Sequence, residues 1–384
     1  MRIAMISTPF VAVPPRGYGG TELVVSQLVE ELHARGHDVT LFATGDSRTR
    51  ARLGALYETA QWPPDVLTDL AHVSWSLRQV ADAAFDVVHV HSAVALAMAR
   101  LLPALPFVYT LHHERDESLS AFYRHCPHAF YVAISADQAR REIPLPSLEV
   151  IHHGLDPAAY ACADRPRDYV CFVGRFAEVK GPHTAIDAAA LAGVPIRVAG
   201  EVHPPDRAFA ERELEPRLAR PHVTLLGAID AAAKRPLLRD ARALLAPITW
   251  HEPFGLILVE AMLSGCPVVA FGRGSVPELV EEGVTGFVVD TVEAMARLIR
   301  PGGPLDRFDR RRCRARAVER FGRARMAADS ERCYARAVAA HAAARGGPAA
   351  GAPAAGHAVW WPGGLPRELA TGRDRAPIPG VLAS

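Results

Sequence analysis

Short apolar runs alternate with longer amphipathic segments along the first 155 residues of the chain. Apolar positions spaced three and four residues apart predict helices at residues 21–35, 67–83 and 136–142, the first of them capped by Thr21. Between them lie runs with the length and composition of buried strands, at residues 2–7, 38–43, 86–91, 107–111, 129–134 and 149–151. This alternation predicts a doubly wound parallel sheet.

The same rhythm begins again after residues 156–168, a polar and proline-bearing stretch that suits a linker. Further strands are predicted at residues 169–173, 196–199, 223–226, 243–246, 268–270 and 287–289. We therefore expect an α/β chain of two Rossmann-like domains, residues 1–155 and 169–321, which face a central cleft. Ligands of open parallel sheets bind at the carboxyl ends of the strands, so the cleft is the expected site.

The last part of the chain divides into a helical segment, residues 322–345, and a region dominated by Gly, Pro and Ala, residues 346–384. The second composition cannot bury enough apolar surface to offset the entropy lost on ordering, so we predict a flexible tail. Trp360 and Trp361 stand out within it. Docking of this pair on the body or on a partner is the alternative to a tail without a role.

Composition places few limits on this chain. Its 384 residues are 49% apolar and 22% charged, as in ordinary globular proteins, and no apolar run is long enough to span a membrane. The first residues lead directly into a strand without the pattern of a signal peptide. Six cysteines show no metal-like spacing and are typical of free thiols in a reducing compartment, which predicts a cytoplasmic protein.

A net charge of +1 hides a basic region, because residues 297–325 include eleven arginines. A solvated helix face is the simpler interpretation of these arginines. A weak contact with anionic lipid at the inner face of a membrane is the alternative. Nucleic acid is not an expected partner, because no aromatic platform or known binding module accompanies the charge.

Two glutamates separated by seven residues, Glu252 and Glu260, flank the start of a strong helix-forming segment at residues 256–263. The amides at the start of a helix lack intrahelical acceptors and can bind an anion or a hydroxyl. Carboxylates accept paired hydrogen bonds from vicinal hydroxyls, as in sugars. Two solvated glutamates on a surface helix are the plainer interpretation. The amides concerned belong to Phe254, Gly255 and Leu256.

Groups suited to a diphosphate occur in both halves of the chain. Gly19 and Gly20 lie where the first predicted helix begins, and a Gly-Gly pair there offers bare amides. Arg175 and Lys180 follow the first strand of the second half. Two cations with a helix terminus can bind a nucleotide diphosphate without a metal, although each cation alone reads equally well as a surface residue.

Histidines gather at three predicted strand ends. No Cys or carboxylate lies at a fixed spacing from them, so no metal site is predicted. Histidine that lines a cleft can instead hydrogen-bond substrate hydroxyls or a leaving group. The residues are His89, His91, His112, His113, His152 and His153.

The segment from Glu252 to Val288 resembles the E-x7-E signature of the retaining glycosyltransferases of family 4, which have the GT-B fold. The matching stretches are Glu252-Pro-Phe-Gly-Leu, Glu260-Ala-Met, Gly265-Cys-Pro-Val-Val, Gly274-Ser-Val-Pro-Glu-Leu-Val and Gly283-Val-Thr-Gly-Phe-Val. The Gly19-Gly20 loop is similar to the GG-x-E loop of the family. Gly174-Arg175 with Lys180-Gly181 is similar to its phosphate clamp.

The resemblance implies a role for each candidate residue. Gly19 and Gly20 would close over the donor diphosphate, and Arg175 and Lys180 would neutralise it. Glu252 and the amides of residues 254–256 would hold the sugar hydroxyls, while Glu260 would hold the ribose. The helix at residues 322–345 would pack back towards the N-terminal domain.

The histidines take their implied roles from the same resemblance. His112 would lie beside the donor sugar and the reaction centre, as the active-site histidine of the family does. His91 and His153 are placed on the acceptor side. The family commonly has Asn where this chain has His153, which leaves the sugar and the acceptor open.

These features predict a hexosyltransferase-like enzyme that moves a sugar, with retention, from a nucleotide diphosphate to a hydroxyl acceptor. UDP is the expected donor nucleotide, because it is the commonest in the resembling family. The acceptor is left as a lipid-linked glycan, a small metabolite or a natural product, and no cofactor or metal is expected. A GT-B nucleotide-sugar epimerase and a non-catalytic nucleotide-sugar-binding protein are the alternatives.

Overall fold

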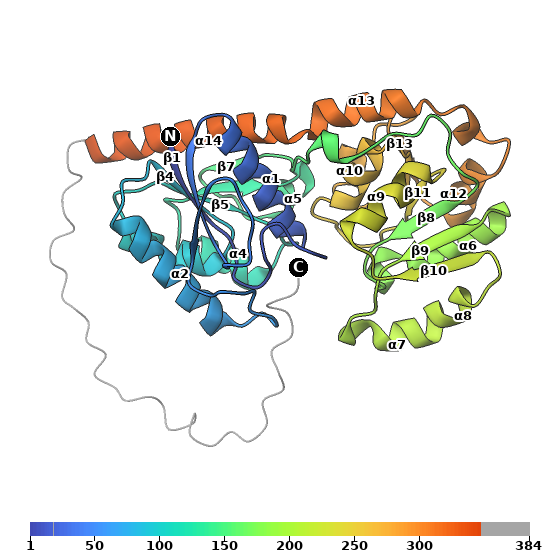
Figure 1. Ribbon diagram of the computed structural model, residues 1–384, viewed down its shortest axis with the longest axis horizontal. Helices are drawn as coiled ribbons and strands as arrows, with labels where there is room; N and C mark the ends of the chain where they lie inside the picture. The colour runs from blue at the N-terminus through green and yellow to red at the C-terminus, as the bar shows by residue number, and fades with distance from the viewer. Residues whose placement is uncertain (18, 347–384) are drawn as a thin grey trace, which may run out of the picture.

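The computed structural model describes residues 1–17 and 19–346, which form two α/β lobes and a pair of C-terminal helices that join them (Figure 1). Each lobe contains one parallel sheet, as the alternating pattern predicts. The expected tail, with Trp360 and Trp361, lies outside the described residues.

The N-terminal lobe is built on a seven-stranded sheet with the order β3-β2-β1-β4-β5-β6-β7. All neighbouring strands are parallel. The short edge strand β3 was not predicted, because its Arg-Leu-Gly-Ala sequence carries little apolar pattern; pairing with β2 forms it. The strands are β1 (Arg2–Ile6), β2 (Asp38–Ala43), β3 (Arg52–Ala55), β4 (Val87–Val90), β5 (Phe107–Thr110), β6 (Phe130–Ala133) and β7 (Leu148–Val150).

Alternate residues of β1 pack on opposite faces of this sheet, because successive strand side chains point to opposite sides. Ile3 and Met5 share a buried cluster with α1 and with the C-terminal helix, whereas Ala4 and Ile6 pack with α2 and α3. The helices of this lobe are α1 (Gly20–Ala34), α2 (Val66–Ala81), α3 (Ala93–Ala97), η1 (Ala99–Leu101), α4 (Glu117–Tyr123) and α5 (Ala136–Arg141).

The predicted cap of α1 is wrong. Gly19 is the N-cap, and no side chain caps this helix. Thr21 lies one residue inside the helix, because the chain turns into α1 at the Gly-Gly pair rather than after it.

The C-terminal lobe contains a six-stranded parallel sheet with the order β10-β9-β8-β11-β12-β13. Its strands, each within a residue or so of a predicted run, are β8 (Val170–Val173), β9 (Ile196–Ala199), β10 (Val223–Gly227), β11 (Leu244–Ala246), β12 (Val268–Phe271) and β13 (Gly286–Val289). The helical elements are η3 (Glu178–Lys180), α6 (Pro182–Ala192), η4 (Pro204–Asp206), α7 (Arg207–Phe209), a π segment (Ala210–Leu214), α8 (Glu215–Leu218), α9 (Ala231–Asp240), α10 (Leu256–Leu263), α11 (Val276–Leu279), α12 (Val292–Ile299), η6 (Pro304–Arg307) and α13 (Arg310–Phe321). A further turn, η2 (Pro157–Ala159), lies between the lobes in sequence.

The final helix, α14 (Arg323–Gly346), leaves the C-terminal lobe and lies along the N-terminal one (Figure 1). Its residues Cys333, Tyr334 and Ala337 are fully buried in the same cluster as α1 and β1. Glu331 accepts two hydrogen bonds of 2.7 Å from the guanidinium of Arg35. The helix thus ties the two lobes together through the N-terminal core.

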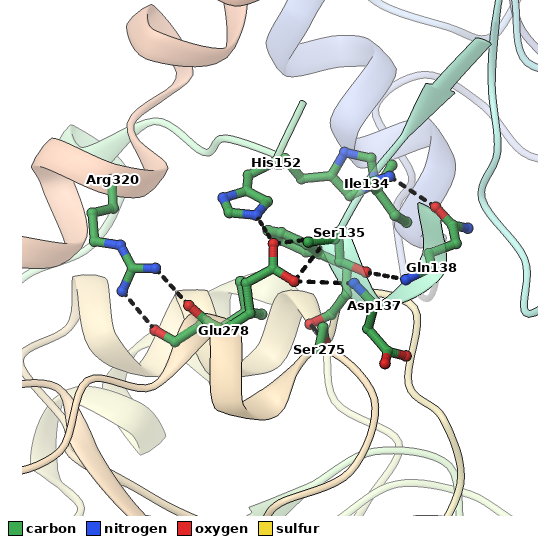
Figure 2. Close-up of polar contacts among 12 residues, drawn as sticks. Ile134, Ser135, Asp137, Gln138, His152, Ser275, Glu278 and Arg320 are labelled. Atoms are coloured by element: carbon green, nitrogen blue, oxygen red, sulfur yellow. Dashed lines mark hydrogen bonds and ion pairs between the residues drawn. The ribbon is translucent and has the colours of Figure 1, made fainter. Parts of the chain in front are cut away.

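A second tie between the lobes is centred on Glu278 of α11 (Figure 2). Its carboxylate accepts the backbone N–H of Ala136, at 2.8 Å, and of Asp137, at 3.3 Å, at the start of α5. It also pairs with His152. Burial by itself would raise the pKa of Glu278. The hydrogen bonds have the larger effect and hold this pKa below its ordinary value. Arg320 donates to the backbone carbonyl oxygens of Glu278 and Leu279.

The basic region is divided, because five of its eleven arginines are exposed and others bond within the protein. Arg310 is only 5% exposed, and its guanidinium donates to three backbone carbonyl oxygens. Arg316 pairs with Glu281 at 2.6 Å and Arg323 with Glu31 at 3.0 Å. These three arginines bind groups of the protein itself, and the contact with anionic lipid stays an alternative prediction. Across the described part of the chain, no helix has the length and apolarity to cross a membrane.

Candidate active site

Helix α10 spans Leu256–Leu263, the bounds predicted for this helix-forming segment. Gly255 is the N-cap with φ of +84°, a left-handed conformation that favours glycine. The amides of Phe254, Gly255 and Leu256 have no hydrogen-bond acceptor among residues 1–17 and 19–346. They remain free to donate to a ligand, as the sequence predicts.

The loop before α10 is held in place by the Gly274-Ser275 turn. The amide of Ser275 donates to the carbonyl oxygen of Glu252 at 3.0 Å, and its hydroxyl donates to that of Phe254 at 2.7 Å. Gly274 has φ of +57°, and a Cβ there would lie 2.3 Å from the backbone nitrogen of Glu252. Glycine is therefore required where this turn meets the loop.

Glu252 lies against Lys180, so the structure brings together two candidates that are 72 residues apart. The indole of Trp250 donates a second hydrogen bond to the same carboxylate oxygen at 3.0 Å. The ammonium of Lys180 lies 4.6 Å from the centre of the Trp250 ring. Since Glu252 is only 9% exposed, these donors compensate a largely buried charge.

Glu260 is 4% exposed and has its own cation, which the sequence analysis missed. The ammonium of Lys234 lies 2.8 Å from the Glu260 carboxylate, and the hydroxyl of Tyr160 donates to it at 2.9 Å. Burial, and then the negative charge of Glu260, raises the pKa of Tyr160. Lys234 is in the first turn of α9, where a lone Lys among alanines gives no signal of its contact.

Arg175 forms its ion pair outside this group. Its Nε lies 3.3 Å from the carboxylate of Asp206 in an ion pair, without the geometry of a hydrogen bond. No contact joins it to Lys180, Glu252 or α10 among the residues that the structure describes. The joint action of Arg175 and Lys180 on a diphosphate stays a prediction.

Four of the six predicted histidines come together at the carboxyl ends of β4, β5 and β7, whereas His113 contacts Tyr123 and His152 contacts Glu278. The Nδ1 of His91 lies 2.8 Å from the Nε2 of His112, and the Nε2 of His91 lies 3.1 Å from the sulfur of Met5. His89 contacts the hydroxyls of Tyr334 at 2.7 Å and Thr110 at 2.8 Å. These four side chains, His89, His91, His112 and His153, are called the histidine cluster below.

Burial keeps the histidine cluster neutral. It lowers the pKa of His89 to about 3, assisted by the neighbouring His112. The pKa values of His91, His112 and His153 are likewise held well below the ordinary value by burial and then by neighbouring histidines. A second positive charge inside such a cluster would be both desolvated and repelled.

His153 connects the histidine cluster to the C-terminal lobe. Its ring stacks on His112 with 5.4 Å between centroids and 22° between planes, and it meets Phe254 edge-on at 4.9 Å. Gly20 also reaches α10, because a Cβ on it would lie 3.4 Å from the side chain of Leu256. The start of α10 is thus where the candidate residues of the two lobes converge.

No group of three or more His, Cys, Asp or Glu within residues 1–17 and 19–346 is arranged to bind a metal ion. The lack of a cofactor stays a prediction. Five of the six cysteines are buried free thiols and Cys162 is partly exposed.

The comparisons with known proteins agree with this architecture. Residues 18–159 match the model of the Glycosyltransferase Family 4 domain, and residues 163–301 match that of Glycosyl transferases group 1. The chain is similar to phosphatidyl-myo-inositol mannosyltransferase of Mycolicibacterium smegmatis, with 29% identity over 330 residues, or 77% of this chain and 83% of the relative.

Two solved structures extend the comparison. One is AviGT4, a glycosyltransferase involved in avilamycin A biosynthesis, with a TM-score of 0.69 and 25% identity over 88% of this chain and 98% of that one. The other is HepE of Anabaena in complex with UDP, with a TM-score of 0.68 and 21% identity over 88% of this chain and 100% of that one.

Two Rossmann-like lobes that meet at the strand carboxyl ends, with carboxylates, cations and free helix amides gathered there, define a glycosyltransferase of the GT-B fold. Matches to both domain families, over both lobes, make the assignment more specific. This chain is a glycosyltransferase of the family 4 type.

Proposed function

We propose that this enzyme transfers a sugar from a nucleotide diphosphate, with UDP as the nucleotide, to a hydroxyl acceptor with retention at the anomeric carbon. The observation that carries the proposal is the convergence at α10. There the Lys180–Glu252 pair, the free amides of residues 254–256 and the histidine cluster meet from the two lobes. A UDP complex of the similarly folded HepE supports the choice of nucleotide.

The C-terminal lobe would bind the donor. Lys180 and Arg175 would neutralise charge that builds on the leaving diphosphate, which is electrostatic stabilisation of the transition state. Arg175 would exchange its ion pair with Asp206 for phosphate oxygens. Glu252 would accept hydrogen bonds from the sugar, and Glu260 from the ribose.

Transfer would proceed at one face of the sugar. The acceptor oxygen bonds to the anomeric carbon as the bond from that carbon to the phosphate oxygen breaks, and the acceptor proton passes to the departing phosphate. His112 would orient the sugar near this carbon, and Gly19 and Gly20 would cover the diphosphate. Because the diphosphate contacts come from both lobes, donor binding is expected to draw the lobes together.

The acceptor is best sought among hydroxyls of inositol phosphates and their lipids. The similar mycobacterial enzyme is named for its action on phosphatidyl-myo-inositol, and its likeness covers both lobes of this chain. A lipid-linked glycan and a small natural product stay in the test panel, because AviGT4 acts in a natural-product pathway.

The experiment begins with the donor. A panel of UDP-, GDP- and dTDP-sugars is screened by thermal shift, since a ligand that binds the native state raises Tm. The best donor is then incubated with inositol phosphates, phosphatidylinositol and glycan acceptors, and the anomeric configuration of the product is read by NMR. Inversion would refute retention.

Two controls separate the alternatives. Donor incubated alone that changes into an isomeric nucleotide sugar identifies an epimerase. Donor binding by calorimetry without transfer to any acceptor, and without hydrolysis, identifies a binding protein. Either outcome would overturn the proposal.

A further inference from the structure

His91 has both ring nitrogens engaged inside the protein. Its Nε2 lies 3.1 Å from the thioether sulfur of Met5, and its Nδ1 lies 2.8 Å from the Nε2 of His112. The side chain is only 6% exposed. Neither ring nitrogen is left to bind another molecule, and the predicted place of His91 on the acceptor side stays a prediction.

The sulfur decides which nitrogen of His91 carries the proton. A thioether has lone pairs and no hydrogen, so it can only accept, and the Nε2 of His91 must donate to it. A neutral imidazole carries one proton, which leaves the Nδ1 of His91 as an acceptor. The Nε2 of His112 must then be the donor in the 2.8 Å contact.

The proton on the Nε2 of His112 also determines the state of the other ring nitrogen, Nδ1. A neutral His112 with its proton on Nε2 has a bare lone pair on Nδ1. No group among residues 1–17 and 19–346 hydrogen-bonds this Nδ1, and His112 is partly exposed. The ring is held flat against His153, which itself contacts Phe254 at the start of α10.

We infer that Met5, acting through His91, holds His112 in the Nε2–H tautomer, so that its Nδ1 accepts a hydrogen bond from a hydroxyl of the donor sugar. This inference rests on the proposed function, which places the sugar beside His112. Met5 and His91 are positioning residues, because they act through His112. The opposite tautomer of His112 would set two lone pairs against each other at the His91 contact.

The remaining cluster does not compete for these protons. His89 lies 4.4 Å from His91 between ring centroids, and its own nitrogens contact Tyr334 and Thr110. The Met5–His91–His112 chain is therefore a separate line of hydrogen bonds that starts in the core of β1.

The test reads the tautomers directly. The full chain is labelled with ¹⁵N-histidine, and long-range ¹H–¹⁵N correlation spectra distinguish protonated from bare ring nitrogens. The signals of His91 and His112 are assigned by their loss in His91→Asn and His112→Asn. We expect both residues to carry the proton on Nε2. A proton on the Nδ1 of His112 would overturn the inference.

Met5→Leu removes the sulfur acceptor with little change of volume. Without this acceptor, we expect His91 to carry its proton on either ring nitrogen, so that both tautomers of His112 appear in the spectrum. Met295→Leu, at a fully buried site of the other lobe, is the matched control and should leave both tautomers unchanged. Unchanged tautomers in Met5→Leu would show that the sulfur does not set them.

The role of the Nδ1 of His112 is tested by replacing this residue with each of two amide side chains, Asn and Gln. The carbonyl oxygen of Asn can stand near the position of Nδ1, whereas Gln reaches the position of Nε2. His112→Asn should keep roughly three- to tenfold more kcat/KM than His112→Gln, the worth of one neutral hydrogen bond. Equal losses would contradict the acceptor role.

Failure of the inference and failure of the proposed function are distinguishable. The tautomers are measured on the protein alone, without donor or acceptor. If no nucleotide sugar raises Tm, the proposed function fails while the spectra still decide the tautomer. A working nucleotide-sugar transferase with His112 protonated on Nδ1 would overturn the inference alone.

Discussion

In the C-terminal lobe the candidate carboxylates lie against ammonium groups, Glu252 with Lys180 and Glu260 with Lys234. In the N-terminal lobe the histidine cluster contains no ion pair among its members and is joined by hydrogen bonds and ring stacking. The C-terminal lobe thus presents compensated charges, and the N-terminal lobe presents neutral hydrogen-bond donors and acceptors.

The comparison also shows how a site can be buried without instability. A buried charge is costly unless it is paired, and a buried imidazole avoids the cost by staying neutral. The buried glutamates are paired with lysines, and the buried histidines stay neutral. Substitutions should therefore have different consequences in the two lobes.

The largest effect is expected for Lys180→Ala. It removes a charged contact to the diphosphate and leaves Glu252 without its cation, so donor affinity should fall about 10- to 150-fold, or ~1.5–3 kcal/mol. Isothermal calorimetry with the donor checks this. Arg212→Ala, which removes a 63% exposed arginine of the same lobe, is the control and should change little.

Glu252→Ala should act on turnover more than on binding. Loss of a charged hydrogen-bond acceptor for the sugar predicts a fall of about tenfold in kcat, with a smaller change in donor Kd. Steady-state kinetics and calorimetry on one preparation separate the two. Equally small changes in kcat and Kd would contradict both the Lys180 and the Glu252 assignments.

Stability towards acid should depend on the neutral histidines. The pKa of His89 is about 3 in the folded protein against an ordinary 6.5, so the unfolded chain binds the extra proton first as pH falls. Below about pH 6.5, His89 therefore lowers the free energy of unfolding by ~1.4 kcal/mol for each unit by which the pH falls. Denaturant unfolding at a series of pH values should show a flatter slope for His89→Gln.

The exposed His125 provides the control for this measurement. His125→Gln should leave the pH slope of unfolding unchanged. A slope in His89→Gln as steep as in the parent protein would mean that His89 is protonated in the folded state.

A smaller effect is expected where the two lobes meet. Glu278→Ala leaves the amides at the start of α5 without their acceptor, which should cost ~1 kcal/mol. Since the pKa of Glu278 is lowered, its contribution is present above the ordinary carboxylate pKa and is lost as pH falls. Thermal unfolding at pH 7 measures the loss. Glu319→Ala, at a 69% exposed site, should show none.

The sequence predicted the scaffold of the C-terminal lobe closely. Its strands are short, mostly apolar runs and α10 is an apolar run between two glycines, and such local signals survive without knowledge of the fold. The edge strand β3 escaped prediction because its pairing with β2, rather than its own pattern, forms it. The N-cap of α1 was misplaced for a similar reason, since the chain turns at Gly19.

By itself the sequence determined two Rossmann-like lobes, the family and the residues of the E-x7-E helix, because periodicity and motifs are local properties of the chain. Only the tertiary structure decided that Lys234 neutralises Glu260, that Arg310 of α13 is buried against the carbonyl oxygen of Ala241, and that Met5 reaches His91. Those contacts join residues 26 to 86 positions apart. Nothing in the local pattern encodes them, because they depend on how the strands and helices are packed.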